Sequence, residues 1–238
     1  MHFSKKRILI IGGGKVGLDA LNFCIENDII PFIIDKNPDC LVNSKVKLFK
    51  IEGTLDFEKE KFDKPLFLQT KLDKIPNLLQ KYKFEYIIPA IPVHIMAKLG
   101  IIYLENKNIK IKPAPDLIEI IKNKIPPFLI HSYDKKSGIL ILSFMPKGEF
   151  CIPGCTEHIK CPKTGIIKEK PLYQILEDLT VNFQSIILRS EQLSPNLGGI
   201  SKHSIKKFFD FINSIDTEFI IGTACMCHGV VNAFEIKI

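Results

Sequence analysis

A glycine-rich turn follows the first apolar segment of the chain. Ile8–Ile11 leads directly into Gly12-Gly13-Gly14-Lys15-Val16-Gly17, which fits the pattern G-x-G-x-x-G. In nucleotide-binding folds the first glycine makes a tight turn, the second lets a pyrophosphate approach the backbone, and the third lets the following helix pack closely on the strand. The phosphates then lie on free N–H groups at the N-terminus of that helix. The pattern predicts a dinucleotide site with contacts from Gly12, Gly14, Lys15, Val16 and Gly17.

An acidic residue follows at the distance that such a site needs. Asp35 ends the next apolar segment, Ile29–Ile34, 18 residues after Gly17. A carboxylate at this position accepts hydrogen bonds from the ribose hydroxyls and repels the 2′-phosphate of NADP. We therefore predict NAD as the cofactor, while the adjacent Lys36 leaves NADP open. The alternative is a glycine turn that joins strand to helix and binds nothing.

Cysteines gather in the C-terminal part of the chain. Cys151, Cys155 and Cys161 lie within eleven residues, and Cys225 and Cys227 form a second group. Thiolates from two short loops are the ligands that zinc or an iron–sulfur cluster requires, so we predict these five as metal ligands. Their spacing matches neither a zinc finger nor a ferredoxin. Reactive redox thiols and buried, inert cysteines remain the alternatives.

Strands and helices alternate through the first 115 residues. This alternation predicts a parallel sheet with right-handed crossovers, and a cofactor crevice at the C-terminal ends of the first and fourth strands. Ala90 and Pro92 follow the fourth strand and are predicted to line this crevice. The predicted strands are 8–11, 29–34, 46–51, 86–90 and 109–112, and the predicted helices are 16–27, 75–82 and 93–104.

The C-terminal half has a different pattern. Four prolines, at 113, 115, 126 and 127, mark the predicted boundary between domains. The predicted strands beyond them are 128–133, 139–144, 185–188, 219–224 and 230–238, and the predicted helices are 171–180 and 202–215. If the strands ending near Phe144, Leu188 and Ala224 run parallel, the loops after them meet at one edge of the sheet. The predicted fold class is α/β: a Rossmann-type parallel sheet in residues 1–115 and a second, smaller α/β or α+β domain in residues 116–238.

The composition narrows the classes of partner. The formal net charge is +7, but Arg7 and Arg189 are the only arginines, and the lysines are scattered along the chain. Nucleic-acid-binding proteins usually concentrate basic residues and use arginine, so nucleic acid is not the expected partner. No apolar run approaches the roughly 18 to 20 residues of a membrane span. We expect a cytoplasmic protein that binds a dinucleotide. Whether it also binds a small-molecule substrate or a protein partner, or forms a homo-oligomer, the sequence leaves open.

The segment Ile10–Gly17 resembles the opening of precorrin-2 dehydrogenases of the siroheme synthase type. It is also similar to the nucleotide-binding domains of TrkA-N potassium-transport regulators. The resemblance covers about residues 5–115, and its motifs are those of Rossmann domains in general. The first family implies NAD-dependent oxidation of a tetrapyrrole precursor, and the second implies nucleotide sensing. Either resemblance implies nucleotide contacts at Gly12, Gly14, Gly17 and Asp35, and neither accounts for the cysteine-rich half.

Two functional hypotheses follow. The first is an NAD(P)-dependent oxidoreductase with a metal or iron–sulfur site in its C-terminal half. The second is a non-catalytic regulatory module of the TrkA-N type that senses nucleotide and redox state. No Ser-Tyr-x-x-x-Lys set or other known acid–base set is present in the sequence, so the catalytic residues are unassigned.

Overall fold

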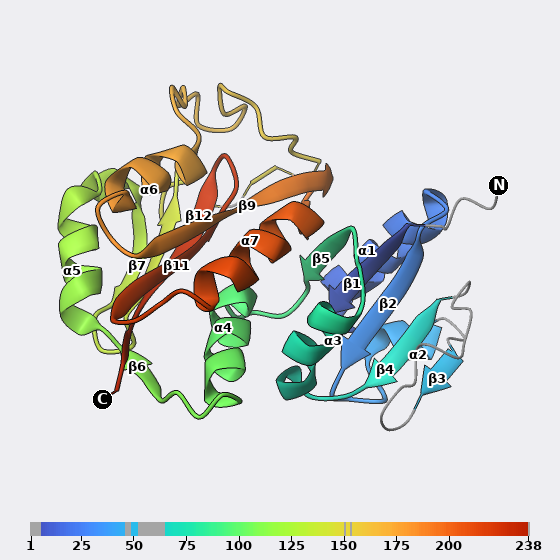
Figure 1. Cartoon of the computed structure of the whole chain (residues 1–238). Coiled ribbons are helices and arrows are strands. Elements are labelled where there is room, and N and C mark those ends of the chain that lie inside the picture. Colours follow the sequence, from blue (N-terminus) through green and yellow to red (C-terminus); the bar gives the residue numbers. More distant parts are fainter. Residues whose placement is uncertain (1–5, 46–48, 52–64, 150, 153, 238) are drawn as a thin grey trace. The chain divides into compact units, whose positions relative to one another are not determined.

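The computed structural model describes residues 6–45, 49–51, 65–149, 151–152 and 154–237, and it shows a mixed α/β chain (Figure 1). Its contacts divide the chain into two compact units. Unit 1 comprises Met1–Ile95 and Leu197–Lys202, and unit 2 comprises Met96–Asn196 and His203–Ile238.

Unit 1 is built on a sheet that is parallel except at one edge. Its strands are, in spatial order, β3 (Phe49–Ile51), β4 (Leu66–Gln69), β2 (Ile30–Asp35), β1 (Arg7–Ile11), β5 (Tyr86–Pro89) and β10 (Leu197–Ser201). The first five pair in parallel, and β10 pairs antiparallel with β5. The strands β1 and β2 are almost entirely buried, as expected of continuous apolar runs covered on both faces.

Helix α1 (Lys15–Glu26) packs on β1 and β2 through one face. Gly17, Ala20, Leu21 and Cys24 are its buried residues, and their spacing places them on one side of a helix. The remaining helices of unit 1 are α2 (Leu41–Lys45), the 3-10 turn η1 (Leu72–Lys74) and α3 (Ile75–Lys81).

Unit 2 holds a second, mostly antiparallel sheet. Its strands are, in spatial order, β9 (Ser185–Ser194), β11 (Glu218–Ala224), β12 (His228–Ile236), β8 (Ile139–Ser143) and β7 (Ile130–Asp134), with β6 (Ile111–Pro113) also paired to β12. Its helices are α4 (Ile95–Glu105), α5 (Pro115–Lys124), the 3-10 turn η2 (Pro127–Leu129), α6 (Leu172–Thr180) and α7 (Lys202–Ile212). Only β9 and β11 pair in parallel among the pairs described for this sheet.

Both faces of the second sheet are covered. Successive residues of a strand point to opposite faces. Ile220 of β11 accordingly joins the core formed with α5 and α6, whereas Ile221 lies beside Gly100 of α4, close to Phe208 of α7. Figure 1 shows α5 and α6 (green and light orange) apart from α4 and α7, with the sheet between the two pairs.

The contact boundary differs from the predicted domain boundary. It falls at Ile95, ahead of the proline-rich stretch, because α4 packs in unit 2 and β6 pairs with β12. The second unit is therefore the larger one, contrary to the prediction. The expectation that residues 109–112 form a fifth parallel strand of the first sheet is also wrong, since β6 is an antiparallel strand of the second sheet. The predicted strand 46–51 lies partly outside the described residues.

The strands that precede the cysteine loops run in the same direction, which was the condition for the loops to meet at one edge of the sheet. The strands β8 and β11 both run antiparallel to β12, and β9 runs parallel to β11, so β8, β9 and β11 share one direction. The last residue of β8, Ser143, pairs with His228, and the last residue of β11, Ala224, pairs with Gly229. The loop after β8 and the turn after β11 therefore leave the sheet at the same edge.

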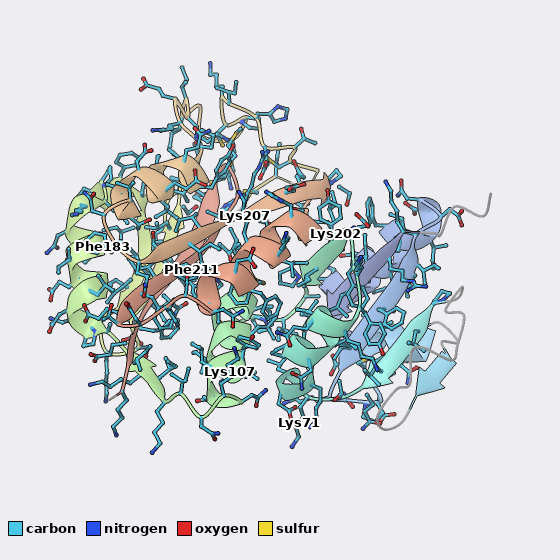
Figure 2. The ribbon with its side chains drawn as sticks, viewed as in Figure 1. Lys71, Lys107, Phe183, Lys202, Lys207 and Phe211 are labelled. Carbon is cyan, nitrogen blue, oxygen red and sulfur yellow. The ribbon has the colours of Figure 1, made fainter. Side chains whose placement is uncertain are left out.

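Basic side chains are spread over the surface of each unit. Lys71 directly precedes η1 in unit 1, Lys107 lies in the turn after α4, and Lys207 lies on α7, all three exposed (Figure 2). Within the described residues, no helix combines the length and apolar character needed to cross a membrane.

Candidate functional sites

The glycine loop connects β1 to α1 in a conformation that requires glycine. Gly12 has a φ of +114°, and a Cβ added to it would lie 2.6 Å from the carbonyl oxygen of Ala90. A Cβ on Gly17 would lie 2.0 Å from the carbonyl oxygen of Gly12. A Cβ on Gly14, in contrast, would meet no atom within 4 Å. Other backbone atoms therefore pack tightly against the loop at Gly12 and Gly17, whereas the space beside Gly14 is open.

The N-terminus of α1 is exposed beside this opening. Gly14 is the N-cap, no side chain caps the helix, and the first turn has no acidic residue. The first helical hydrogen bond runs from the Leu18 N–H to the Gly14 carbonyl at 2.9 Å, so the N–H groups ahead of Leu18 have no partner within the helix. Lys15 and Val16 are exposed in this turn. Partial positive charge at the helix end and the Lys15 ammonium both favour an anion here.

Asp35 is held against the glycine loop at the end of β2. Its Oδ2 accepts a hydrogen bond from the Gly13 N–H at 2.7 Å, and its Oδ1 accepts one from the Asn37 N–H at 2.8 Å. A Cβ on Gly13 would lie 2.3 Å from the Sγ of Cys40. Gly13 and Cys40 thus shape this loop, although the sequence pattern leaves position 13 free and gave no role to Cys40.

The two crevice residues predicted after the fourth strand occupy different surroundings. Ala90 lies against Gly12, and its N–H donates to the Ile11 carbonyl at 2.8 Å. Pro92 is exposed in the turn between β5 and α4.

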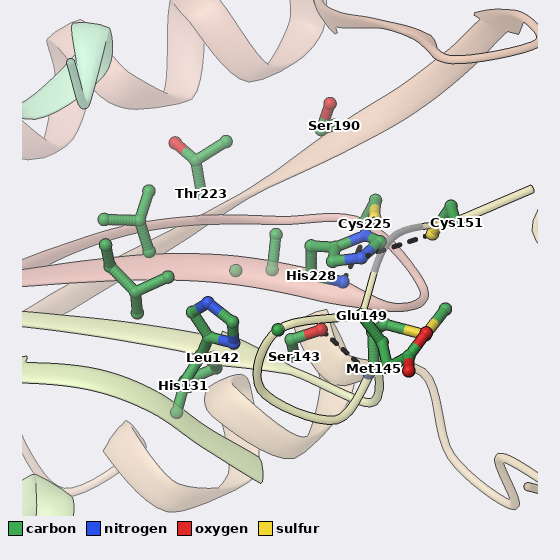
Figure 3. A pocket seen from close by; sticks show the side chains of 15 residues that line it. His131, Leu142, Ser143, Met145, Glu149, Cys151, Ser190, Thr223, Cys225 and His228 are labelled. Carbon is green, nitrogen blue, oxygen red and sulfur yellow. Dashed lines mark hydrogen bonds between the residues drawn. The ribbon is translucent and has the colours of Figure 1, made fainter. Parts of the chain in front are cut away.

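Unit 2 contains a cavity of about 560 Å³ at the edge where β8 and β11 end. Most of its lining is apolar, and its polar side chains include His131, Ser190, Thr223 and His228 (Figure 3). Among the described residues, the buried Nδ1 of His131 has no hydrogen-bond partner. A cavity of this size with a few polar groups is typical of small-molecule sites.

His228 stands between two thiols in the wall of this cavity. Its Nε2 lies 3.6 Å from the Sγ of Cys151, and its Nδ1 lies 3.8 Å from the Sγ of Cys225 (Figure 3). Desolvation by the surrounding chain, assisted by the charge of Lys168, lowers the pKa of His228. Burial raises the pKa of Cys225 to about 12. Burial therefore favours the neutral forms of both His228 and Cys225.

A second, smaller cavity adjoins the first and holds most of the predicted metal ligands. Its walls include Cys151, Cys155, Cys161 and Cys227, together with Lys168. The Nζ of Lys168 donates to the Sγ of Cys227 at 3.0 Å, and Lys168 is only 4% exposed. We call these four cysteines and Lys168 the thiol cluster. Cys225 does not line this cavity.

All the cysteines are free thiols. Within the described part of the chain, no group of three or more His, Cys, Asp or Glu side chains is arranged to hold a metal ion. His158, which stands near the cysteines in sequence, is exposed and bonds to the Thr156 hydroxyl at 3.1 Å.

Two residues of these cavities had no signal in the sequence. Lys168 is one lysine in a lysine-rich chain, and nothing in its surroundings marks it as buried. His131 lies on a short strand, where a histidine most often has a structural role. Only the fold shows that both face the cavities.

The comparisons with known proteins concern the whole chain. A protein of Archaeoglobus fulgidus, described as "Uncharacterized protein", is 28% identical over 227 residues, which cover 95% of this chain and 98% of the relative. No solved structure matches the chain. One family model, AF_1314_N, described as "Uncharacterized protein, N-terminal domain", matches residues 8–95. The second model, AF_1314_C, described as "Uncharacterized protein, C-terminal domain", matches residues 91–237. Because this match covers more than half of the chain, the chain belongs to that family.

Proposed function

We propose that unit 1 binds a dinucleotide, NAD in preference to NADP, and that the chain is an oxidoreductase. The observation that carries the proposal is the glycine loop, which is tightly packed at Gly12 and Gly17 and open at Gly14. Packing alone explains why glycine is needed at positions 12 and 17, but it does not explain glycine at position 14. A pyrophosphate that approaches the backbone at Gly14 would explain it.

The strand order supports the same ligand. The parallel strands β4, β2, β1 and β5 follow one another across the sheet, which corresponds to the order 3-2-1-4 of a Rossmann mononucleotide-binding half when β3 is counted as an added edge strand. In that fold the ligand lies where the order reverses, outside the carboxyl ends of the first and fourth strands. Gly12 and Ala90 follow these two ends and lie in contact range of each other.

Asp35 supports NAD over NADP. Each of its carboxylate oxygens accepts one backbone hydrogen bond, and a carboxylate has about four acceptor positions, so acceptors remain for ribose hydroxyls. A 2′-phosphate would meet the same carboxylate as a like charge. Lys36 is exposed beside it.

The oxidoreductase part of the proposal is supported by unit 2. Its large cavity has room for a small-molecule substrate, and His131, Ser190 and Thr223 offer hydrogen bonds within apolar walls. NAD, when bound, supplies or accepts a hydride, and the protein binds and orients the reactants. The second candidate function, a nucleotide- and redox-sensing module, is favoured by the gathering of thiols beside this cavity.

Thermal unfolding with and without nucleotide tests the binding proposal. At a concentration 100 times the Kd, a ligand adds about 2.7 kcal/mol to stability. For a chain of this size we expect NAD to raise the Tm by about 5 to 10 °C, and NADP to raise it less.

To distinguish enzyme from sensor, purified protein and NADH are incubated with a small-molecule extract, and loss of the reduced-nicotinamide absorbance is followed. Nucleotide binding without any turnover would favour the sensor.

Replacing Asp35 by asparagine should weaken NAD binding about tenfold and abolish the preference over NADP, because hydrogen bonds to the charged carboxylate are lost and the like charge is removed. Asp39→Asn, an exposed change in the same loop, serves as the matched control. Binding of each nucleotide is measured by titration calorimetry. If wild-type protein binds NADP as tightly as NAD, the role assigned to Asp35 is wrong.

A further inference from the structure

We propose that Cys151, Cys155, Cys161 and Cys227 together hold a thiolate-bound metal centre, either a zinc ion or an iron–sulfur cluster. Both centres use four cysteine thiolates as their ligands. The site lies wholly within unit 2, so it does not depend on nucleotide binding by unit 1.

The fold brings these four residues to one cavity from two distant segments. Three of them follow β8, and Cys227 lies in the turn between β11 and β12. Because β8 and β11 end at the same edge of the sheet, their loops leave the sheet side by side. The four thiols then line the same small cavity.

The thiol cluster contains a buried cation. Lys168 is only 4% exposed, and its Nζ donates a hydrogen bond to the Sγ of Cys227 at 3.0 Å. Lysines are almost never buried without a partner for their charge, so this cation favours thiolates over neutral thiols beside it.

Cys161 lies in a turn that backbone hydrogen bonds hold in place. Gly165, with a φ of +72°, closes the turn by donating its N–H to the Cys161 carbonyl at 2.9 Å. The Cys161 N–H donates to the Ile166 carbonyl at 2.8 Å. These bonds fix the backbone of Cys161 at the wall of the small cavity.

The four cysteines line one cavity, but among the described residues their side chains are not arranged as a group that could hold a metal ion. Thiolates around one zinc, with Zn–S of about 2.3 Å, lie about 3.8 Å apart, and a cluster needs them around a larger core. Either centre therefore requires the loop between β8 and α6 to adjust. No strand or helix is found in the described part of this loop, where a single isolated bridge joins Lys160 and Ile167. Metal binding would contribute free energy to ordering the ligand side chains in this segment.

Cys225 is left out of the ligand set, although the sequence placed it among the candidates, because it does not line the small cavity with the other four cysteines. It lies next to His228 in the wall of the larger cavity, which Cys151 also lines (Figure 3). Its Sγ accepts hydrogen bonds from the N–H groups of Cys227 at 3.4 Å and His228 at 3.3 Å, and a serine oxygen can accept the same bonds.

The test is the metal content of the full chain purified without oxygen. We expect either a coloured protein with iron and sulfide, or a colourless protein with about one zinc per chain, which distinguishes the two centres. Cys161→Ser and Cys227→Ser should each lower the metal content at least about tenfold, in line with loss of a ligand. Cys225→Ser and Cys24→Ala should retain the metal, and circular dichroism checks that every variant is folded.

Two results would overturn the proposal. One is a wild-type chain that contains neither iron nor zinc after anaerobic purification and cannot be loaded with either. The other is equal metal content in wild type, Cys161→Ser and Cys227→Ser. Nucleotide titration of the same Cys161→Ser sample reports on unit 1 alone, so failure of the dinucleotide proposal is seen separately.

Discussion

Replacing Gly14 by alanine is expected to weaken NAD binding at least about tenfold while the protein stays folded. The added methyl group would meet no protein atom within 4 Å, so nothing in unit 1 opposes it. The backbone also allows it, since Gly14 has a φ of −78°. A pyrophosphate lying on the start of α1 would meet the methyl directly, and a loss of about 1.4 kcal/mol in binding is tenfold in Kd.

The measurement pairs affinity with stability. Calorimetric titration gives the Kd for NAD, and urea unfolding gives the free energy of unfolding, which should fall by no more than about 1 kcal/mol for this change at an N-cap. Asp19→Ala, an exposed change in the same helix, is the matched control and should leave both quantities near wild type. Unchanged NAD affinity in Gly14→Ala would show that no ligand occupies the space above the loop.

Gly17→Ala, unlike Gly14→Ala, should destabilise unit 1 by about 3 kcal/mol or more. Its Cβ would lie 2.0 Å from the Gly12 carbonyl oxygen, a distance that real Cβ atoms essentially never show. Overpacking a core costs about 1 to 3 kcal/mol when side chains can yield, and here the obstacle is backbone. Helix α1 would have to move away from β1, which also displaces the helix N-terminus.

Urea unfolding measures this change, and far-ultraviolet circular dichroism confirms that the starting state is folded. Comparison with Gly14→Ala separates the two roles of glycine in one loop, close packing at 17 and ligand access at 14. A Gly17→Ala protein as stable as wild type would contradict the described packing of α1 on β1.

The first elements of unit 1 could be predicted from sequence because their signals are local. The predicted strands 8–11 and 29–34 correspond to β1 and β2, and the predicted helix 16–27 corresponds to α1, with bounds that differ by one residue at most. The strand β4 was not predicted, since a run of only four residues carries little periodicity. The strand β10 was not predicted either, because its pairing with β5 is set by contacts far apart in sequence.

The glycine loop could be predicted from the sequence more fully than the thiol cluster, because its signals are local in the chain. A spacing rule finds Gly12, Gly14 and Gly17, whose roles depend on neighbours in the chain. The gathering of the cysteine loops could be stated only as a condition, since it depends on the directions of β8 and β11, and the pairing with β12 settles it. No local pattern separates Lys168 from the many exposed lysines, because its burial arises from tertiary packing alone.

Dinucleotide binding by the glycine loop of unit 1 can be measured by isothermal titration of NAD into the wild-type full chain. We expect saturable binding of one NAD per chain, tighter than the binding of NADP. No heat of binding and no stabilisation at millimolar NAD, NADH or NADP would contradict it, and the loop would then be a strand-to-helix connection without a ligand.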